Sequence, residues 1–130
     1  MSAKAPFRLT WGLSQSEWDE ARERLRGLLA GVASDRATVT YAECAQVAFS
    51  GRFSPRSSAL AQLLEEVCTI EDAERGVMLG SVVVRKDSGI PGRGYFSFAR
   101  ESLGREGETD RELWESEVER VWNAYRPAGS

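Results

Sequence analysis

The chain has 130 residues, of which 42% are hydrophobic and 28% charged, and its formal net charge is −3. This length suits one domain with a single core, so we treat residues 1–130 as one domain. The sequence contains no histidine, which excludes Ser-His-Asp and Cys-His nucleophile pairs and histidine-based zinc sites. We therefore expect a non-catalytic protein without a metal or other cofactor.

The first predicted helix spans residues 15–32 and follows a short extended segment at residues 7–11. Ser14 and Glu17 have the spacing of a capping box, in which each side chain accepts a bond from a free backbone amide. Apolar residues then recur at helical spacing, which predicts one buried face. They are Trp18, Ala21, Leu25, Leu28, Leu29 and Val32.

A second, short helix is predicted at Tyr41–Ala48. Thr40 and Glu43 form a capping box at its start, and small residues on its inward face let another helix approach closely. A turn follows at Phe49–Phe53, where Gly51 supplies the positive φ angle that tight turns need.

A third helix is predicted to begin at Ser54-Pro55, because serine caps helices and proline suits the first helical turn. We expect it to end between residues 67 and 70 and a polar turn to follow at residues 71–76. The acidic side chains near this end are predicted to be solvated rather than catalytic or metal-binding. They are Glu65, Glu66, Glu71, Asp72 and Glu74.

Two strands and a last helix are predicted next. Met78–Arg85 contains three consecutive valines, a composition typical of a buried strand. The loop Lys86–Gly94 is rich in glycine and proline, and Tyr95–Phe98 alternates aromatic and small residues, as the returning strand of a hairpin would. The final helix is expected at residues 110–125, after another capping box.

This element order predicts an α+β fold whose core, residues 38–98, is a winged helix-turn-helix. It would contain a short helix, a recognition-like helix and a two-stranded wing, braced by the helices at residues 14–32 and 109–125. Cys44 and Cys68 lie among apolar neighbours and are expected to be buried thiols, with a disulfide or a reactive thiol as the alternatives.

Three segments of the central unit carry a family resemblance: TYAECAQ, SPRSSALAQLL and MLGSVVVRKDSGIPGRGYF. In this order, over about residues 38–96, they resemble the DNA-binding domain of alkylguanine-DNA alkyltransferases and alkyltransferase-like proteins. The resemblance implies a shared scaffold and DNA contact. The family's Pro-Cys-His-Arg segment would fall near Leu79–Val83 and its arginine finger near Ala59, so alkyl transfer and base flipping are not implied.

The third predicted helix is the first candidate binding surface. In a helix-turn-helix the second helix enters the major groove of DNA, with its N-terminal half facing base edges. Arg56, Ser58 and Gln62 have side chains that bond bases or phosphates. We therefore predict contact with double-stranded DNA there, and a solvated or protein-contacting helix face is the alternative.

The loop Lys86–Gly94 is the second candidate. As a wing it would place Lys86 and Arg93 beside a phosphate backbone, with Arg52 nearby. A structural hairpin turn is one alternative. A phosphate-cradling glycine loop is another, although such loops open a helix after a strand, whereas this loop is predicted to join two strands.

The last predicted helix favours a different function. Trp114 and Trp122 belong to an apolar stripe, and residues 101–130 carry four basic and eight acidic side chains. Such a stripe is usually core, but aromatic residues are also enriched at interface hot spots. A protein partner or a second copy of the chain is therefore the alternative to DNA, and a carboxylate-based enzyme is the least supported hypothesis.

The sequence also indicates where the protein acts. No apolar run approaches the ~20 residues that span a bilayer, and the N-terminal segment lacks the apolar stretch of a signal peptide. We expect a cytoplasmic protein that does not contact membranes.

Overall fold

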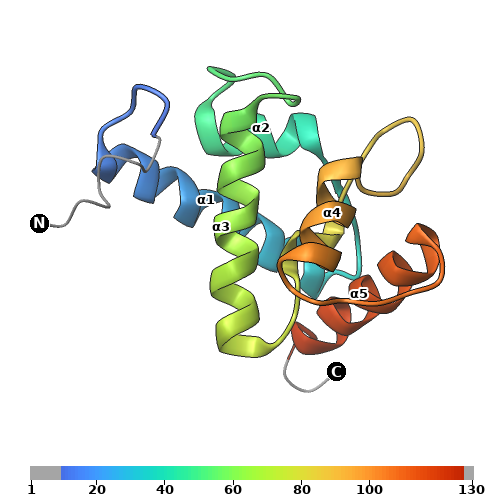
Figure 1. The fold of residues 1–130 in the computed structure, drawn as a ribbon. Coiled ribbons are helices and arrows are strands. Elements are labelled where there is room, and N and C mark those ends of the chain that lie inside the picture. The colour runs from blue at the N-terminus through green and yellow to red at the C-terminus, as the bar shows by residue number, and fades with distance from the viewer. Residues whose placement is uncertain (1–9, 128–130) are drawn as a thin grey trace, which may run out of the picture.

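The computed structural model describes residues 10–127 and shows a mainly helical chain with one small sheet. Helix α3 crosses α1, and α4 and α5 lie on the side away from the first turns of α1 (Figure 1). The elements, in chain order, are α1 (Gln15–Ser34), β1 (Val39–Thr40), α2 (Tyr41–Phe49), α3 (Ser58–Arg75), the 3₁₀-helix η2 (Leu79–Val82), β2 (Val83–Val84), α4 (Arg93–Glu101) and α5 (Asp110–Ala124).

Three helices begin where the capping motifs predict. The Glu17 amide donates to Ser14 Oγ at 3.0 Å, and the Ser14 amide donates to the Glu17 carboxylate at 2.8 Å. The same reciprocal pair opens α2, and Thr109 caps α5. The predictions for α1, α2 and α5 are confirmed to within two residues at each end.

The main core lies where α1 meets α2, α3, η2 and α5. Trp18, Leu25 and Leu29 on one face of α1 are completely buried, together with Leu79 of η2. This is the apolar stripe that the helical spacing predicts. A smaller cluster joins α4 to α5 through the buried side chains of Met78, Phe96, Ala99 and Leu113.

Helix α3 begins later and ends later than predicted. Ser57, not Ser54, is its N-cap, and the Leu60 amide donates to Ser57 Oγ at 3.1 Å. Ser54 Oγ instead accepts from the amide of Arg56 at 3.1 Å, so it closes a local turn ahead of the helix. The helix then continues through the predicted polar turn and ends at Gly76, whose φ angle of 71° suits glycine.

The predicted strand at Met78–Arg85 is mostly wrong. Its first part is η2, and only Val83–Val84 is extended. The valines are buried on every side, so a run of β-branched residues reports burial here rather than a long strand. Strand β2 pairs in parallel with β1, with Val39 opposite Val83, and α2 and α3 form the crossover that a parallel pair needs.

The predicted wing hairpin is also wrong. Tyr95–Phe98 lies inside α4 rather than in a returning strand. Phe96 and Ala99, three residues apart, are the buried residues of this helix, and that spacing places both on one helical face. The glycine-rich segment therefore leads into a helix.

The resulting fold is mainly helical with a two-stranded parallel sheet, which is loosely compatible with the predicted α+β class. The winged helix-turn-helix is not found. The extended segment predicted at residues 7–11 lies mostly outside the described residues, and Trp11 itself occupies a turn with a φ angle of 56°. None of the described helices has both the length and the apolar character needed to cross a bilayer.

Two glycines within α1 are expected to limit its stability. Gly27 and Gly31 are exposed, and a Cβ atom at either position would have no neighbour within 4 Å. Replacing either with alanine should raise the free energy of unfolding by about 0.5–1 kcal/mol, because alanine lowers the entropy lost on helix formation. Urea denaturation measures this change. The control is Gly76→Ala, which forces alanine to a φ angle of 71° and should destabilise by about 1–2 kcal/mol.

Candidate functional site

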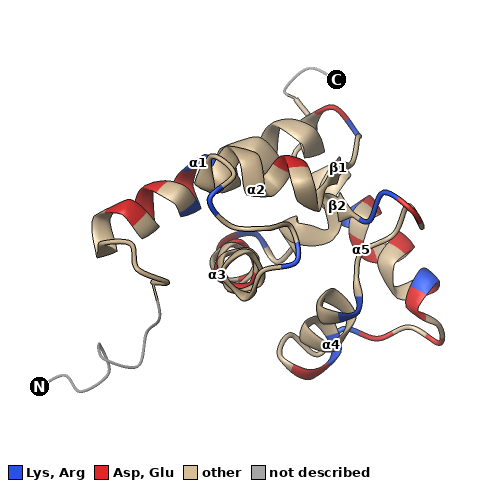
Figure 2. Ribbon diagram, turned by 90° about the horizontal axis from the view of Figure 1, so that it is seen from above, with Lys and Arg blue, Asp and Glu red and all other residues tan. Residues whose placement is uncertain are grey.

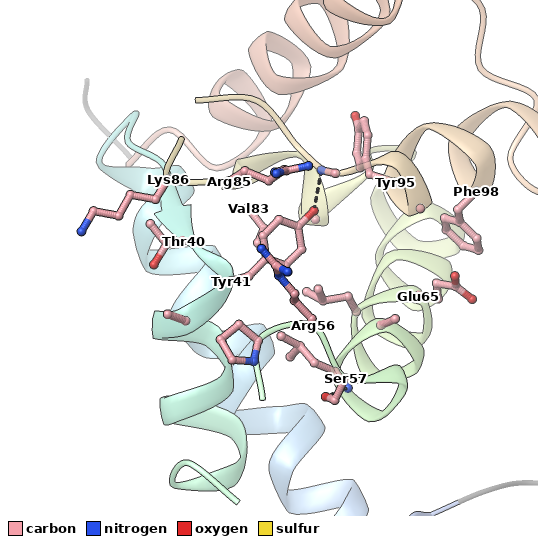
Figure 3. Close-up of a pocket in the computed structure, with 18 of the residues that line it drawn as sticks. Thr40, Tyr41, Arg56, Ser57, Glu65, Val83, Arg85, Lys86, Tyr95 and Phe98 are labelled. Atoms are coloured by element: carbon pink, nitrogen blue, oxygen red, sulfur yellow. Dashed lines mark hydrogen bonds between the residues drawn. The ribbon is translucent and has the colours of Figure 1, made fainter. Parts of the chain in front are cut away.

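A pocket of about 740 Å³ lies between α2, α3, the loop after β2 and the start of α4. Figure 3 shows the residues that surround it. Its apolar wall comes mainly from Tyr41, Leu60, Ala61, Leu64, Val83, Tyr95 and Phe98. Arg56, Glu65, Arg85, Lys86 and Asp87 supply its charged groups.

Two tyrosines in the wall are fixed by hydrogen bonds. The Gly92 amide donates to Tyr41 Oη at 3.0 Å, and Tyr95 Oη lies 2.7 Å from Ser81 Oγ. Burial raises the pKa of both phenols, so both stay neutral at physiological pH. These contacts hold the rings in place, which gives the pocket a preformed aromatic wall.

The cysteine thiols are buried, as predicted. Cys68 lines the pocket, and its sulfur accepts a bond from the Gly80 amide at 3.2 Å. Burial raises the pKa of Cys68 and of Cys44 to about 12. Because the thiolate is the nucleophilic form of cysteine, neither thiol is suited to attack a substrate.

Four basic side chains form no hydrogen bond or ion pair with any residue that the structure describes: Arg52, Arg56, Lys86 and Arg93. We call them the unpaired cations. All four are exposed. The other basic side chains between residues 10 and 127 each form a hydrogen bond or an ion pair with an oxygen. Those that donate a hydrogen bond are Arg22, Arg24, Arg26, Arg36, Arg85, Arg100, Arg105, Arg111, Arg120 and Arg126. Arg75 forms an ion pair with Glu71 at 3.5 Å.

Two of the unpaired cations line the pocket, and a third is adjacent in the sequence to residues that line it. Arg56 and Lys86 line it, and Arg93 lies between Gly92 and Gly94, which also line it. Arg56 points into the pocket toward Tyr41, whereas Lys86 points outward from its edge (Figure 3). Arg52 lies at the other end of the α2–α3 loop, where its guanidinium carbon is 5.5 Å from the centre of the Phe53 ring.

The two other residues predicted to contact DNA differ in whether their polar atoms are already hydrogen-bonded within the chain. Ser58 is exposed at the first residue of α3. Gln62 is half-buried and accepts a bond from Trp11 Nε1 at 3.2 Å, while its amide donates to Glu66 at 3.2 Å. The fold therefore uses the polar atoms of Gln62, and a base contact would have to compete with these bonds.

The two tryptophans predicted for partner binding make contacts within the chain. Trp114 Nε1 donates to the Ser81 carbonyl at 2.7 Å, and Trp122 Nε1 donates to the Ala37 carbonyl at 3.0 Å. Both rings are partly buried against the main core. Helix α5 thus uses its aromatic stripe to pack on the rest of the chain, and partner binding by these rings stays a prediction.

Of the acidic side chains predicted to be solvated, Glu65 and Glu74 are exposed, whereas Glu71 is buried and Glu66 and Asp72 are half-buried. Glu71 is only 2% exposed, accepts a hydrogen bond from Tyr125 and lies 3.5 Å from Arg75. Asp72 pairs with Arg105. The cause is that α3 continues past the predicted end, so Glu71 follows Val67 by four residues on its buried face. Among the described residues no three acidic or thiol groups converge on a metal-sized site.

The sequence pattern does not predict the pocket. The strand predicted at Tyr95–Phe98 would place the side chains of these two residues on opposite faces. In α4 they are three residues apart on one face, and both line the pocket. Their i, i+3 spacing after a glycine-rich segment is the sequence feature that indicates a shared helical face.

Comparison with family models, with curated proteins and with solved structures found no match for this chain. The resemblance of residues 38–96 to alkylguanine-DNA alkyltransferases therefore stays a hypothesis.

Proposed function

We propose that this protein binds double-stranded DNA through its unpaired cations, without catalysing a reaction on it. The observation that supports this proposal is that Arg52, Arg56, Lys86 and Arg93 form no hydrogen bond or ion pair with a described residue, whereas the other described basic side chains do. Arg52 lies over the ring of Phe53, a contact that leaves its N–H groups available. A free cation can replace a counterion on a phosphate without first giving up an internal bond. Contacts of this kind position a protein on DNA but do not read sequence.

The distribution of charge is compatible with this function despite the net charge of −3. The loop between α2 and α3 carries basic residues and no acidic ones, whereas many acidic residues lie along α1 and α5 (Figure 2). Screening reduces interactions between exposed charges beyond about 8 Å at physiological salt. The acidic residues of α1 and α5 therefore have less effect on DNA bound at the unpaired cations than Glu65 and Asp87, which line the same pocket as Arg56 and Lys86.

We propose binding without catalysis because no described residue of the pocket is an activated nucleophile. Burial raises the pKa of Cys68, the thiol that lines it. The segment Leu79–Val83, where the resemblance would place a reactive cysteine, holds Leu-Gly-Ser-Val-Val. The hydroxyl of its serine, Ser81, is buried and bonded to Tyr95.

DNA affinity should depend on the unpaired cations and on salt. A fluorescein-labelled duplex titrated at about 50–200 mM salt is expected to bind with an affinity that falls as salt rises. Arg52→Gln and Arg93→Gln should each weaken binding and reduce the slope of log K against log salt by about 0.9, the value for one phosphate contact. Fluorescence anisotropy measures both quantities.

The matched control is Arg111→Gln on α5. This change removes the same charge, but Arg111 already pairs with Glu115 at 3.3 Å. It should leave affinity and salt slope nearly unchanged. If no salt-dependent binding is detected, or if Arg111→Gln weakens it as much as the other two variants, the DNA proposal is wrong.

Self-association or partner binding through α5 has less support. The indole N–H groups of Trp114 and Trp122 already donate to carbonyls within the chain. An interface there would use the exposed part of each ring, because the buried part packs against the main core.

A further inference from the structure

We propose that the pocket binds a small organic anion with a flat, apolar body. This function goes beyond DNA binding and needs no DNA. The pocket volume of about 740 Å³ lies within the roughly 300–1,000 Å³ typical of small-molecule sites. Such sites combine a mostly apolar wall with a few polar groups that orient the ligand, and this pocket has both parts.

The wall fits a flat ring system. Tyr41, Tyr95 and Phe98 contribute aromatic surface, and Leu60 and Leu64 contribute aliphatic surface. The hydroxyl groups of Tyr41 and Tyr95 are already bonded to Gly92 and Ser81. The rings therefore offer their faces and edges to a ligand, and aromatic groups pack favourably against such surfaces.

Charge selects an anion over a neutral or cationic ligand. Arg56 points into the pocket toward Tyr41 (Figure 3), and no described residue bonds to its guanidinium. A planar guanidinium binds carboxylate, sulfonate or phosphate oxygens through paired N–H groups. The neighbouring Arg85 already pairs with Asp87 at 2.8 Å, so Arg56 is the side chain that would receive the anionic group.

Glu65 determines where the negative group of the ligand lies. It lines the pocket beside Phe98, on the other side from Lys86 (Figure 3). A carboxylate there repels a second anion. The anionic group of a ligand therefore belongs near Arg56, and its apolar body extends along the wall toward Phe98.

Two fluorescent probes separate the contributions of charge and shape. 1-Anilinonaphthalene-8-sulfonate carries a sulfonate on a flat aromatic body, and N-phenyl-1-naphthylamine has the same body without the charge. The sulfonate should bind one molecule per folded chain, about 10- to 100-fold more tightly than the neutral probe, because a bond to a charged group adds that much affinity. Equal affinities, or no binding of the sulfonate at about 1 mM, would overturn the proposal.

Two substitutions locate the probe. Arg56→Met should lower the affinity of the sulfonate about 10- to 100-fold and leave that of the neutral probe unchanged. Ala61→Phe should weaken both probes at least about tenfold, because Ala61 is exposed on α3 and lines the pocket, so the added ring occupies the cavity. Near-UV circular dichroism confirms that each variant is folded, and Ala42→Phe fills the pocket from α2 if Ala61→Phe does not fold.

The outcome is independent of the DNA proposal. Arg93→Gln and Arg52→Gln should weaken DNA binding without changing the affinity of the sulfonate probe, since neither side chain lines the pocket. Ala61→Phe should weaken binding of the sulfonate probe without changing DNA binding. Loss of DNA binding alone leaves the anion site supported, whereas sulfonate binding that survives both Arg56→Met and the pocket-filling variants contradicts it.

Discussion

Replacing Trp18 with alanine is expected to lower the free energy of unfolding by about 3–5 kcal/mol. The Trp18 side chain is completely buried, and its ring centre lies 5.9 Å from that of Phe49. Truncation would open a cavity where α1 meets α2 and α3. It would also remove the indole N–H that donates to Glu66 at 3.0 Å. Small domains are stable by only about 5–15 kcal/mol, so the variant should be much easier to unfold.

Trp18→Phe separates the two losses. Phenylalanine fills most of the cavity but cannot donate to Glu66, which still accepts a bond from Arg22 at 2.8 Å. We expect this variant to lose about 1–2 kcal/mol. Urea denaturation of both variants measures the difference. Equal losses for the alanine and phenylalanine variants would mean that the hydrogen bond, not the packing of the ring, determines the contribution of Trp18.

The helices that the sequence predicts well are those whose ends are encoded locally. Ser14 with Glu17 and Thr40 with Glu43 satisfy free amides using residues three positions apart, so each motif specifies its own helix start. The start of α3 shows the limit of this reasoning. Both Ser54 and Ser57 can cap, and the chain uses Ser57.

The error at the predicted wing has a tertiary cause. The run Val82–Val84 suggested a strand because β-branched residues favour strands. These valines are instead buried by several elements at once, and only the last two pair with β1. A segment buried on all sides can be rich in β-branched residues without forming a long strand. The local sequence pattern does not predict how many elements will pack around a segment.

The sequence pattern identifies basic residues of the candidate site but does not predict the pocket that two of them line. The sequence pattern places Arg56 on a recognition helix and Lys86 on a wing, whereas the structure places both at the edge of one pocket. Their lack of ion-pair partners depends on where every carboxylate of the fold lies. Which basic side chains lack an ion-pair partner can therefore be determined only from the folded arrangement of α2, α3 and the segment after β2.

Removing Arg105 should have the largest effect of any change to a charged side chain. Arg105 Nε donates to Glu117 at 3.0 Å, and the same guanidinium pairs with Asp72 of α3. Glu117 is only 5% exposed, and its other ion-pair partner is Arg120 at 3.3 Å. Arg105→Met would leave a buried carboxylate poorly compensated, so we expect a loss of about 3–5 kcal/mol at neutral pH.

A double variant and a surface variant test whether the loss comes from the buried carboxylate left without its partner. Arg105→Met combined with Glu117→Met removes the unpaired charge and should recover much of the loss, because apolar replacements of a buried ion pair are often nearly neutral. Arg111→Met breaks an exposed pair whose side chains are 59% and 57% accessible and should cost less than about 1 kcal/mol. Urea denaturation of the three variants tests this order. If Arg105→Met costs no more than Arg111→Met, the bonds from Arg105 to α3 and α5 do not stabilise the fold.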